Sequence, residues 1–99
     1  MRTKEACQRR HAIQRALERY EVALNRDSYD ALCRKVQYQD GVFIARQSNR
    51  VSLWQVQAVN IRGEKVQCNV VYDKSRGQIV TFLPPGATET LRGIALPSV

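Results

Sequence analysis

Apolar residues in the first quarter of the chain recur at spacings of three and four, the period of a helix that is buried on one side. Between residues 4 and 24 neither glycine nor proline interrupts this pattern, which predicts a first helix. The apolar stripe consists of Ile13, Ala16, Leu17, Tyr20, Ala23 and Leu24. After a polar break the same period returns, so we expect a second, shorter helix over about residues 28–36, with Asp27 or Ser28 as its N-cap.

In the second half of the chain the pattern changes to an alternation of period two. Its clearest example is the stretch 65–83, where apolar residues alternate with Gln67 and Asn69, a polar turn follows at 73–77, and a β-rich run resumes. Pro84 and Pro85 remove two backbone donors, which ends this hairpin. The expected strands cover residues 42–47, 51–61, 65–72 and 78–83.

These elements predict an α+β fold. Short loops join the four expected strands, so consecutive strands should be antiparallel neighbours in one sheet. A sheet with one apolar face needs a cover, and the two N-terminal helices can provide it. Ninety-nine residues can bury one core but not two, so we expect a single domain over residues 1–99. The weakly patterned tail, 86–99, is expected to pack as a short strand or helix, or to fray.

The charge of the chain narrows the choice of partner. Sixteen basic and nine acidic residues give a net charge of +7, and twelve of the sixteen basic residues are arginine. A guanidinium group can bind two phosphate oxygens at once, so this composition favours a nucleic acid as the partner. A small basic protein that binds an acidic protein would have the same composition, and this alternative stays open.

The chain has no apolar run of about 18 residues, and its charged start is not followed by an apolar signal segment. We therefore expect a soluble, cytoplasmic protein that does not enter a membrane. Cys7, Cys33 and Cys68 are odd in number and widely spaced, which argues against a disulfide framework and a zinc site. The acidic residues show helix-surface spacings without a paired strand motif, so we expect neither a metal nor a cofactor.

The first helix carries the candidate chemistry. His11, Arg15 and Arg19 are four residues apart and form one basic row along it. His11 is the only histidine, and an imidazole can give or take a proton near neutral pH. The apolar stripe is centred more than about 100° away from His11 and Arg15 around the helix. The row is therefore either a solvated surface or, if the helix lies at the rim of the sheet, one wall of a groove.

Short motifs at both ends of residues 10–84 resemble those of a known group of proteins. The first helix contains His11-Ala12, Arg15 and Arg19, and the last hairpin contains Val70-Val71-Tyr72-Asp73 and Ile79-Val80-Thr81. This arrangement is similar to that of the small metal-independent ribonuclease toxins of the barnase, EndoU, colicin and RelE superfamily. The likeness is greatest to toxin-like domains of bacterial polymorphic and toxin-antitoxin systems.

The resemblance implies two helices on a four-stranded antiparallel sheet with RNA across the sheet face, and it needs no cofactor. A ribose 2′-hydroxyl would attack the neighbouring phosphate, leaving a cyclic phosphate and a 5′-hydroxyl. By this analogy His11 is the acid or base, Arg15 and Arg19 hold the phosphate, and the Thr81 hydroxyl donates to a phosphate oxygen. A neutralising acidic protein, either an antitoxin or an immunity protein, would be a second partner.

Further basic residues lie near the ends of the expected strands, where they could follow a phosphate backbone or protect a sheet edge. They are Arg46, Arg50, Arg62 and Lys65. Two other functions stay open beside the ribonuclease. One is a nucleic-acid-binding module without chemistry, and the other is a small phage or mobile-element protein that binds an acidic protein surface. The sequence does not indicate the oligomeric state.

Overall fold

The computed structural model describes residues 4–86, in which two helices precede a four-stranded sheet. The strands pair in the order β1-β2-β3-β4, each antiparallel to the next, as the sequence predicts. The elements are α1 (Lys4–Tyr20), α2 (Arg26–Gln37), β1 (Val42–Arg46), β2 (Val51–Val59), β3 (Lys65–Asp73) and β4 (Gln78–Phe82). The expected α+β fold is therefore confirmed, whereas residues 87–99 of the tail lie outside the described residues.

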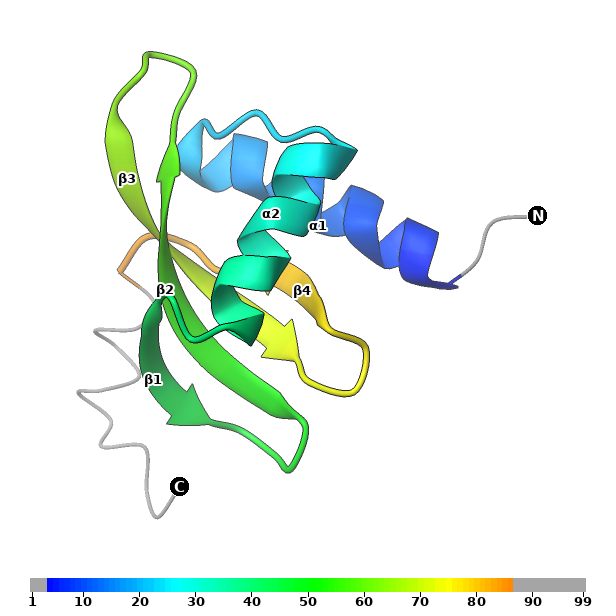
Figure 1. Ribbon diagram of the computed structural model, residues 1–99. Coiled ribbons are helices and arrows are strands. Elements are labelled where there is room, and N and C mark those ends of the chain that lie inside the picture. Colours follow the sequence, from blue (N-terminus) through cyan, green and yellow to red (C-terminus); the bar gives the residue numbers. More distant parts are fainter. Residues whose placement is uncertain (1–3, 87–99) are drawn as a thin grey trace.

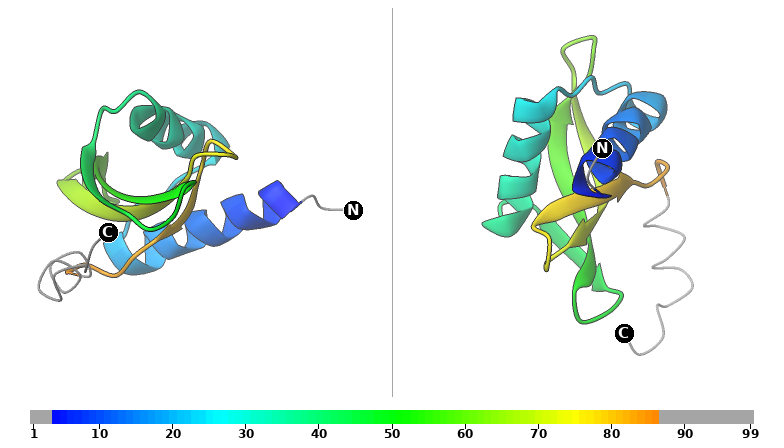
Figure 2. Two further views of the ribbon diagram at one scale, coloured as in Figure 1. Left: turned by 90° about the horizontal axis from the view of Figure 1, so that it is seen from below. Right: turned by 90° about the vertical axis from the view of Figure 1, so that its right-hand side faces the viewer.

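The two helices occupy different places on the sheet. The sheet is curved; α2 lies across its concave face, and α1 runs along the edge strand β4 (Figures 1 and 2). This placement covers one edge of the sheet with a helix, while β1 forms the other edge. Between residues 4 and 86 neither helix has the length and apolar content that crossing a membrane would need.

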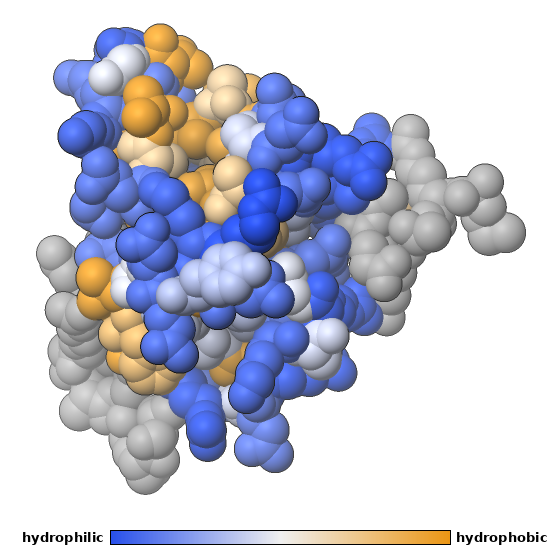
Figure 3. All heavy atoms as spheres, viewed as in Figure 1, coloured by the Kyte–Doolittle hydropathy of each residue, from blue (hydrophilic) through white to orange (hydrophobic). Residues whose placement is uncertain are grey.

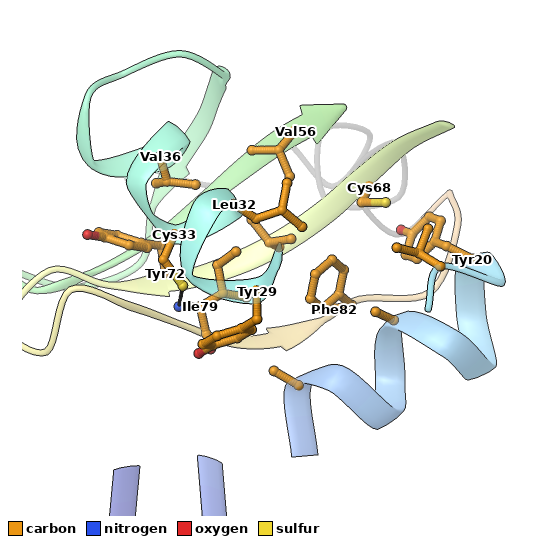
Figure 4. Packing of buried hydrophobic residues seen from close by; sticks show 14 residues of the cluster. Tyr20, Tyr29, Leu32, Cys33, Val36, Val56, Cys68, Tyr72, Ile79 and Phe82 are labelled. Atoms are coloured by element: carbon orange, nitrogen blue, oxygen red, sulfur yellow. Dashed lines mark hydrogen bonds between the residues drawn. The ribbon is translucent and has the colours of Figure 1, made fainter. Parts of the chain in front are cut away.

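The hydrophobic core lies between the concave face of the sheet and α2, and the buried side of α1 completes it at one edge (Figure 4). Alternate residues of β3 point into it, and the buried residues of α2 meet them at helical spacing. These residues are Tyr29, Leu32, Cys33 and Val36 from α2, and Cys68, Val70 and Tyr72 from β3. The buried hydroxyl of Tyr29 donates to the carbonyl oxygen of Ile79 at 2.6 Å, which joins α2 to β4.

The end of α1 and the start of α2 differ from the predicted boundaries. α1 ends at Tyr20 instead of residue 24, because Glu21 has a left-handed backbone (φ 57°) and Val22 turns into the core. α2 begins at Arg26 instead of residue 28, because Asn25 is its N-cap. The Asn25 side chain accepts from the Ser28 backbone N–H, and the Ser28 hydroxyl accepts from the Asn25 N–H, each at 2.8 Å. This reciprocal capping satisfies two donors at the helix start.

The strands match their predicted ranges to within two residues. The largest difference is at the end of β2, which stops at Val59 instead of residue 61. The Asn60 side-chain oxygen accepts from the backbone N–H groups of Arg62 and Glu64, both at 2.9 Å, and this closes the turn early.

A β-bulge fixes the direction of Thr81. Val71 pairs with Thr81 while Tyr72 pairs with Ile79, so Val80 is the extra residue of β4. Paired residues share a face of the sheet, and Tyr72 and Ile79 belong to the core on the concave face. Thr81 therefore lies on the opposite, convex face.

Candidate functional site

The buried side of α1 is rotated relative to the predicted apolar stripe. Ala12 and Ala16 are fully buried and Tyr20 is 9 % exposed, whereas Leu17, which belonged to the predicted stripe, is 48 % exposed. The two small alanine side chains allow the helix to approach β4 closely. Arg19 lies beside Ala12 and Ala16 at about 100° per residue, so the rotation brings the Arg19 end of the basic row to the seam between α1 and β4.

His11 and Thr81, which are 70 residues apart in the chain, meet across this seam. The Nε2 atom of His11 lies 3.4 Å from the Oγ1 atom of Thr81. The His11 side chain is exposed and Thr81 is half-buried, so this pair is open to a ligand. Which of the two atoms donates the hydrogen depends on the tautomer of the imidazole. Two residues that the sequence singled out at opposite ends of the chain are thus neighbours.

The two arginines of the basic row are held differently. The Arg19 Nη1 atom donates to the carbonyl oxygen of Phe82 at 2.6 Å, at the end of β4. One guanidinium group carries five N–H donors, so this bond leaves others available. The Arg15 Nη1 atom donates to the Glu18 carboxylate at 2.6 Å on the exposed side of the helix. This hydrogen bond is the main cause that lowers the pKa of Glu18.

The seam contains a third contact that the sequence analysis missed. Arg76, in the turn between β3 and β4, donates from Nη1 to the side-chain oxygen of Gln8 at 3.0 Å. Its Nε atom also lies 3.8 Å from Asp73 Oδ2. Gln8 comes three residues before His11 and therefore projects from the same side of α1. A polar turn residue gives no sequence signal that it will reach a helix 68 residues away.

The four remaining predicted residues do not form one group. Arg46 and Arg50 are at the turn between β1 and β2, and Arg62 and Lys65 are at the turn between β2 and β3, at the opposite end of β2 (Figure 1). Arg62 donates to Glu64 at 2.9 Å and pairs also with Glu21, so two carboxylates offset its charge.

Within the described residues, no group of three or more histidine, cysteine, aspartate or glutamate side chains is placed to hold a metal ion. The chain matches no protein-family model, and no curated protein or solved structure shows significant similarity to it.

Proposed function

We propose that the chain is a metal-independent endoribonuclease whose reactive site is the seam between α1 and β4. One observation carries the proposal. His11 and Thr81, identified from separate motifs of the sequence, have their polar atoms 3.4 Å apart where α1 covers the β4 edge of the sheet, and the His11 side chain is exposed there. Arg15 and Arg19 follow His11 on the same helix at intervals of one turn. An imidazole, a hydroxyl and two permanent cations are groups that can act together on a phosphodiester.

The proposed reaction needs one proton acceptor and groups that stabilise charge on the phosphate. The neutral imidazole of His11 takes the proton of a ribose 2′-hydroxyl while the 2′-oxygen forms a bond to phosphorus. The bond from phosphorus to the 5′-oxygen breaks, and that oxygen takes a proton from water. The products are a 2′,3′-cyclic phosphate and a 5′-hydroxyl. No oxidant, reductant or metal ion enters this balance.

The other groups act on the charge that develops on the phosphate. Thr81 donates from its hydroxyl to a phosphate oxygen, once that hydroxyl is released from His11. Arg19 is fixed by its bond to the Phe82 carbonyl oxygen, so its remaining donors have a defined direction. Arg15 binds the phosphate when it exchanges Glu18 for the RNA. An exposed ion pair of this kind is weak, so the exchange costs little.

A nucleic-acid-binding module without chemistry is the second candidate. The observation that favours it is that both arginines of the row already have partners, Glu18 and the Phe82 carbonyl oxygen. In this case the row binds phosphate groups, and RNA stays intact. Binding would then weaken steeply with salt, because each phosphate contact releases counterions.

The deciding experiment measures RNA cleavage by the full chain in the presence of EDTA. We expect cleavage to fall roughly 100-fold or more in His11→Ala, the range for loss of a general base. Thr81→Val keeps the side-chain shape without the hydroxyl, and we expect a fall of roughly tenfold or more. The matched control is Arg34→Ala on α2, which lies away from the seam and should cleave normally.

Circular dichroism must stay unchanged in all three variants, and the products must carry a cyclic phosphate. Cleavage that persists in both His11→Ala and Thr81→Val would remove the assignment. RNA that stays intact with the wild-type chain but binds it tightly at low salt would select the second candidate.

A further inference from the structure

A pocket of about 650 Å³ opens at the end of the sheet where β1 turns into β2. Its walls come from the end of α2, from β1 and β2, and from the start of the turn after β3. It lies on the face that carries α2, whereas Thr81 lies on the convex face. Below the end of α2 the visible surface is mostly hydrophilic, with an apolar patch beside it (Figure 3). The volume is within the range of small-molecule sites, about 300–1,000 Å³.

Aromatic rings form one wall of the pocket. Phe43 and Trp54 are directly paired across β1 and β2 and pack edge to face, with ring centroids 5.5 Å apart. The Trp54 indole N–H donates to the Ser52 hydroxyl at 2.9 Å, which fixes the direction of the indole ring. Phe43 is nevertheless 54 % exposed. An exposed phenyl ring beside an oriented indole is a surface on which a flat ring can stack.

Every charged residue that lines the pocket is basic. These residues are Arg46, Arg50 and Lys74. The nearest carboxylate partner is Asp73, whose Oδ2 atom lies 3.9 Å from the Arg50 Nε atom. Asp73 is 3 % exposed and its other oxygen accepts from Ser75, so little of its charge faces solvent. The pocket thus joins an aromatic wall to a positive rim, in which the charge of Arg50 is partly offset by Asp73.

Amide side chains complete the lining. Gln37, Gln39 and Asn49 each add a donor and an acceptor that can bind the edge of a base. Gln39 follows α2 with a left-handed backbone (φ 58°), a position that normally favours glycine. Its N–H donates to the Val36 carbonyl oxygen at 2.9 Å, as in a glycine-terminated helix. A glutamine therefore occupies a place where glycine would be less strained, and this glutamine lines the pocket.

Basic residues link the pocket rim to the seam. Asp73 lies between Arg50, at 3.9 Å, and Arg76, at 3.8 Å, and Arg76 in turn contacts Gln8 on α1. The backbone N–H of Lys74 donates to the Arg50 carbonyl oxygen at 2.7 Å, so the two turns at this end of the sheet are joined. A polyanion that leaves the seam at α1 meets positive side chains along this end as far as the pocket.

We propose that this pocket binds one unpaired nucleotide of a single-stranded RNA, with the base against Phe43 and Trp54 and the phosphates on Arg46 and Lys74. The inference rests on the proposed function for the identity of the ligand, because it makes the pocket a second contact of the same RNA. A base inside a duplex is stacked on its neighbours and cannot enter such a pocket. The pocket would therefore restrict the protein to unpaired RNA.

The test uses the fluorescence of Trp54, which is the only tryptophan of the chain. The probe is a short single-stranded 2′-O-methyl oligoribonucleotide, which lacks the attacking hydroxyl and cannot be cleaved. We expect it to quench Trp54 at low salt in the wild-type chain, whether or not that chain cleaves RNA. Because quenching does not depend on the reaction, the experiment tests binding in the pocket separately from RNA cleavage.

Two variants and one control assign the quenching to the pocket. Arg46→Gln should bind roughly three- to tenfold more weakly and reduce the salt slope by about one, as expected for one lost phosphate contact. Phe43→Leu keeps an apolar side chain but not the ring, and should bind roughly threefold or more weakly. Arg34→Gln removes the same charge from the exposed side of α2 and should bind like the wild type.

The pocket assignment is overturned if the oligonucleotide does not quench Trp54 at low salt. It is also overturned if Arg34→Gln weakens binding as much as Arg46→Gln, since net charge alone then explains the affinity. Equal quenching by a duplex of the same length, or by an acidic peptide, would likewise exclude a site for an unpaired nucleotide. Arg46 and Phe43 are both exposed, so their replacement should leave the fold intact.

Discussion

The Tyr20 hydroxyl accepts a hydrogen bond of 3.1 Å from the backbone N–H of Asn69, and this bond ties the last residue of α1 to β3. Leu83, directly after β4, donates its N–H to the Asn69 carbonyl oxygen at 2.8 Å. The end of the helix thus meets the sheet where β4 ends. Because α1 is one continuous helix, this contact also sets the position of His11 beside Thr81.

We expect Tyr20→Phe to lower the free energy of unfolding by about 1–2 kcal/mol, because it removes a buried hydrogen bond and leaves the ring in place. Burial raises the pKa of the Tyr20 hydroxyl, so this group stays neutral and the effect should not vary near neutral pH. Urea unfolding measures the change. Tyr38→Phe is the control, since Tyr38 is 75 % exposed and should not affect stability. Equal stability of Tyr20→Phe and the wild type would contradict the anchoring role.

Asp73 should make the turn after β3 sensitive to acid. Burial, the largest single influence, raises its pKa, but hydrogen bonds from Ser75 and Arg76 and the charge of Arg50 together hold the pKa below its ordinary value of 3.8. A carboxylate with a lowered pKa stabilises the fold above its unfolded pKa, and this contribution is lost as the pH falls through the folded pKa.

The variant Asp73→Asn isolates this effect. At neutral pH it should be less stable than the wild type by about 1–2 kcal/mol, because the asparagine keeps the turn but not the charge. The difference should shrink as the pH falls below about 4. Urea unfolding of both chains at several pH values provides the comparison. A difference that is constant with pH would show that the carboxylate charge plays no part.

The three thiols should differ sharply in reactivity. Cys7 is exposed, whereas Cys33 and Cys68 are buried in the core. Burial raises the pKa of Cys33 and raises that of Cys68 to about 12, so neither forms the reactive thiolate at neutral pH. We expect an aromatic disulfide reagent to modify Cys7 rapidly and the other two only in denaturant. Rapid modification of all three in the folded chain would contradict the packing of α2 on the sheet.

The elements of the fold were predictable because their signals are local. The alternation along β3 and the polar turn before β4 indicate a hairpin whatever covers it. The predicted start of α2 is two residues too late. Asn25, Asp27 and Ser28 are all good capping residues. The choice between them depends on the reciprocal hydrogen bonds of Asn25 and Ser28, which the sequence does not reveal.

The rotation of α1 was not predictable in the same way. Apolar content favoured a stripe through Leu17, but the helix meets an edge strand instead of a broad sheet face, and the narrow row of Ala12 and Ala16 suits that contact better. Tertiary packing therefore outweighed side-chain hydrophobicity. The proximity of His11 to Thr81 depends on this rotation and on the bulge at Val80, neither of which leaves a pattern in the sequence.

The charge of the seam can be tested separately from its chemistry with Glu18→Gln. This change replaces the carboxylate that holds Arg15 by a neutral amide oxygen, so the guanidinium exchanges it for a phosphate more easily. We expect the affinity for an uncleavable single-stranded oligoribonucleotide to rise roughly two- to fivefold at low salt and the gain to fade as salt increases. Fluorescence anisotropy with a labelled oligonucleotide measures the affinity and its dependence on salt.

Glu64→Gln is the matched control for Glu18→Gln, because it changes the net charge by the same amount in the turn between β2 and β3, beyond the C-terminal end of α1. There the loss of Glu64 leaves Arg62 with one carboxylate, Glu21, still beside it. If RNA follows the seam between α1 and β4, Glu64→Gln should leave the affinity almost unchanged. Equal gains in the two variants would mean that RNA responds only to total charge, and Arg15 would then lose its assigned place at the phosphate.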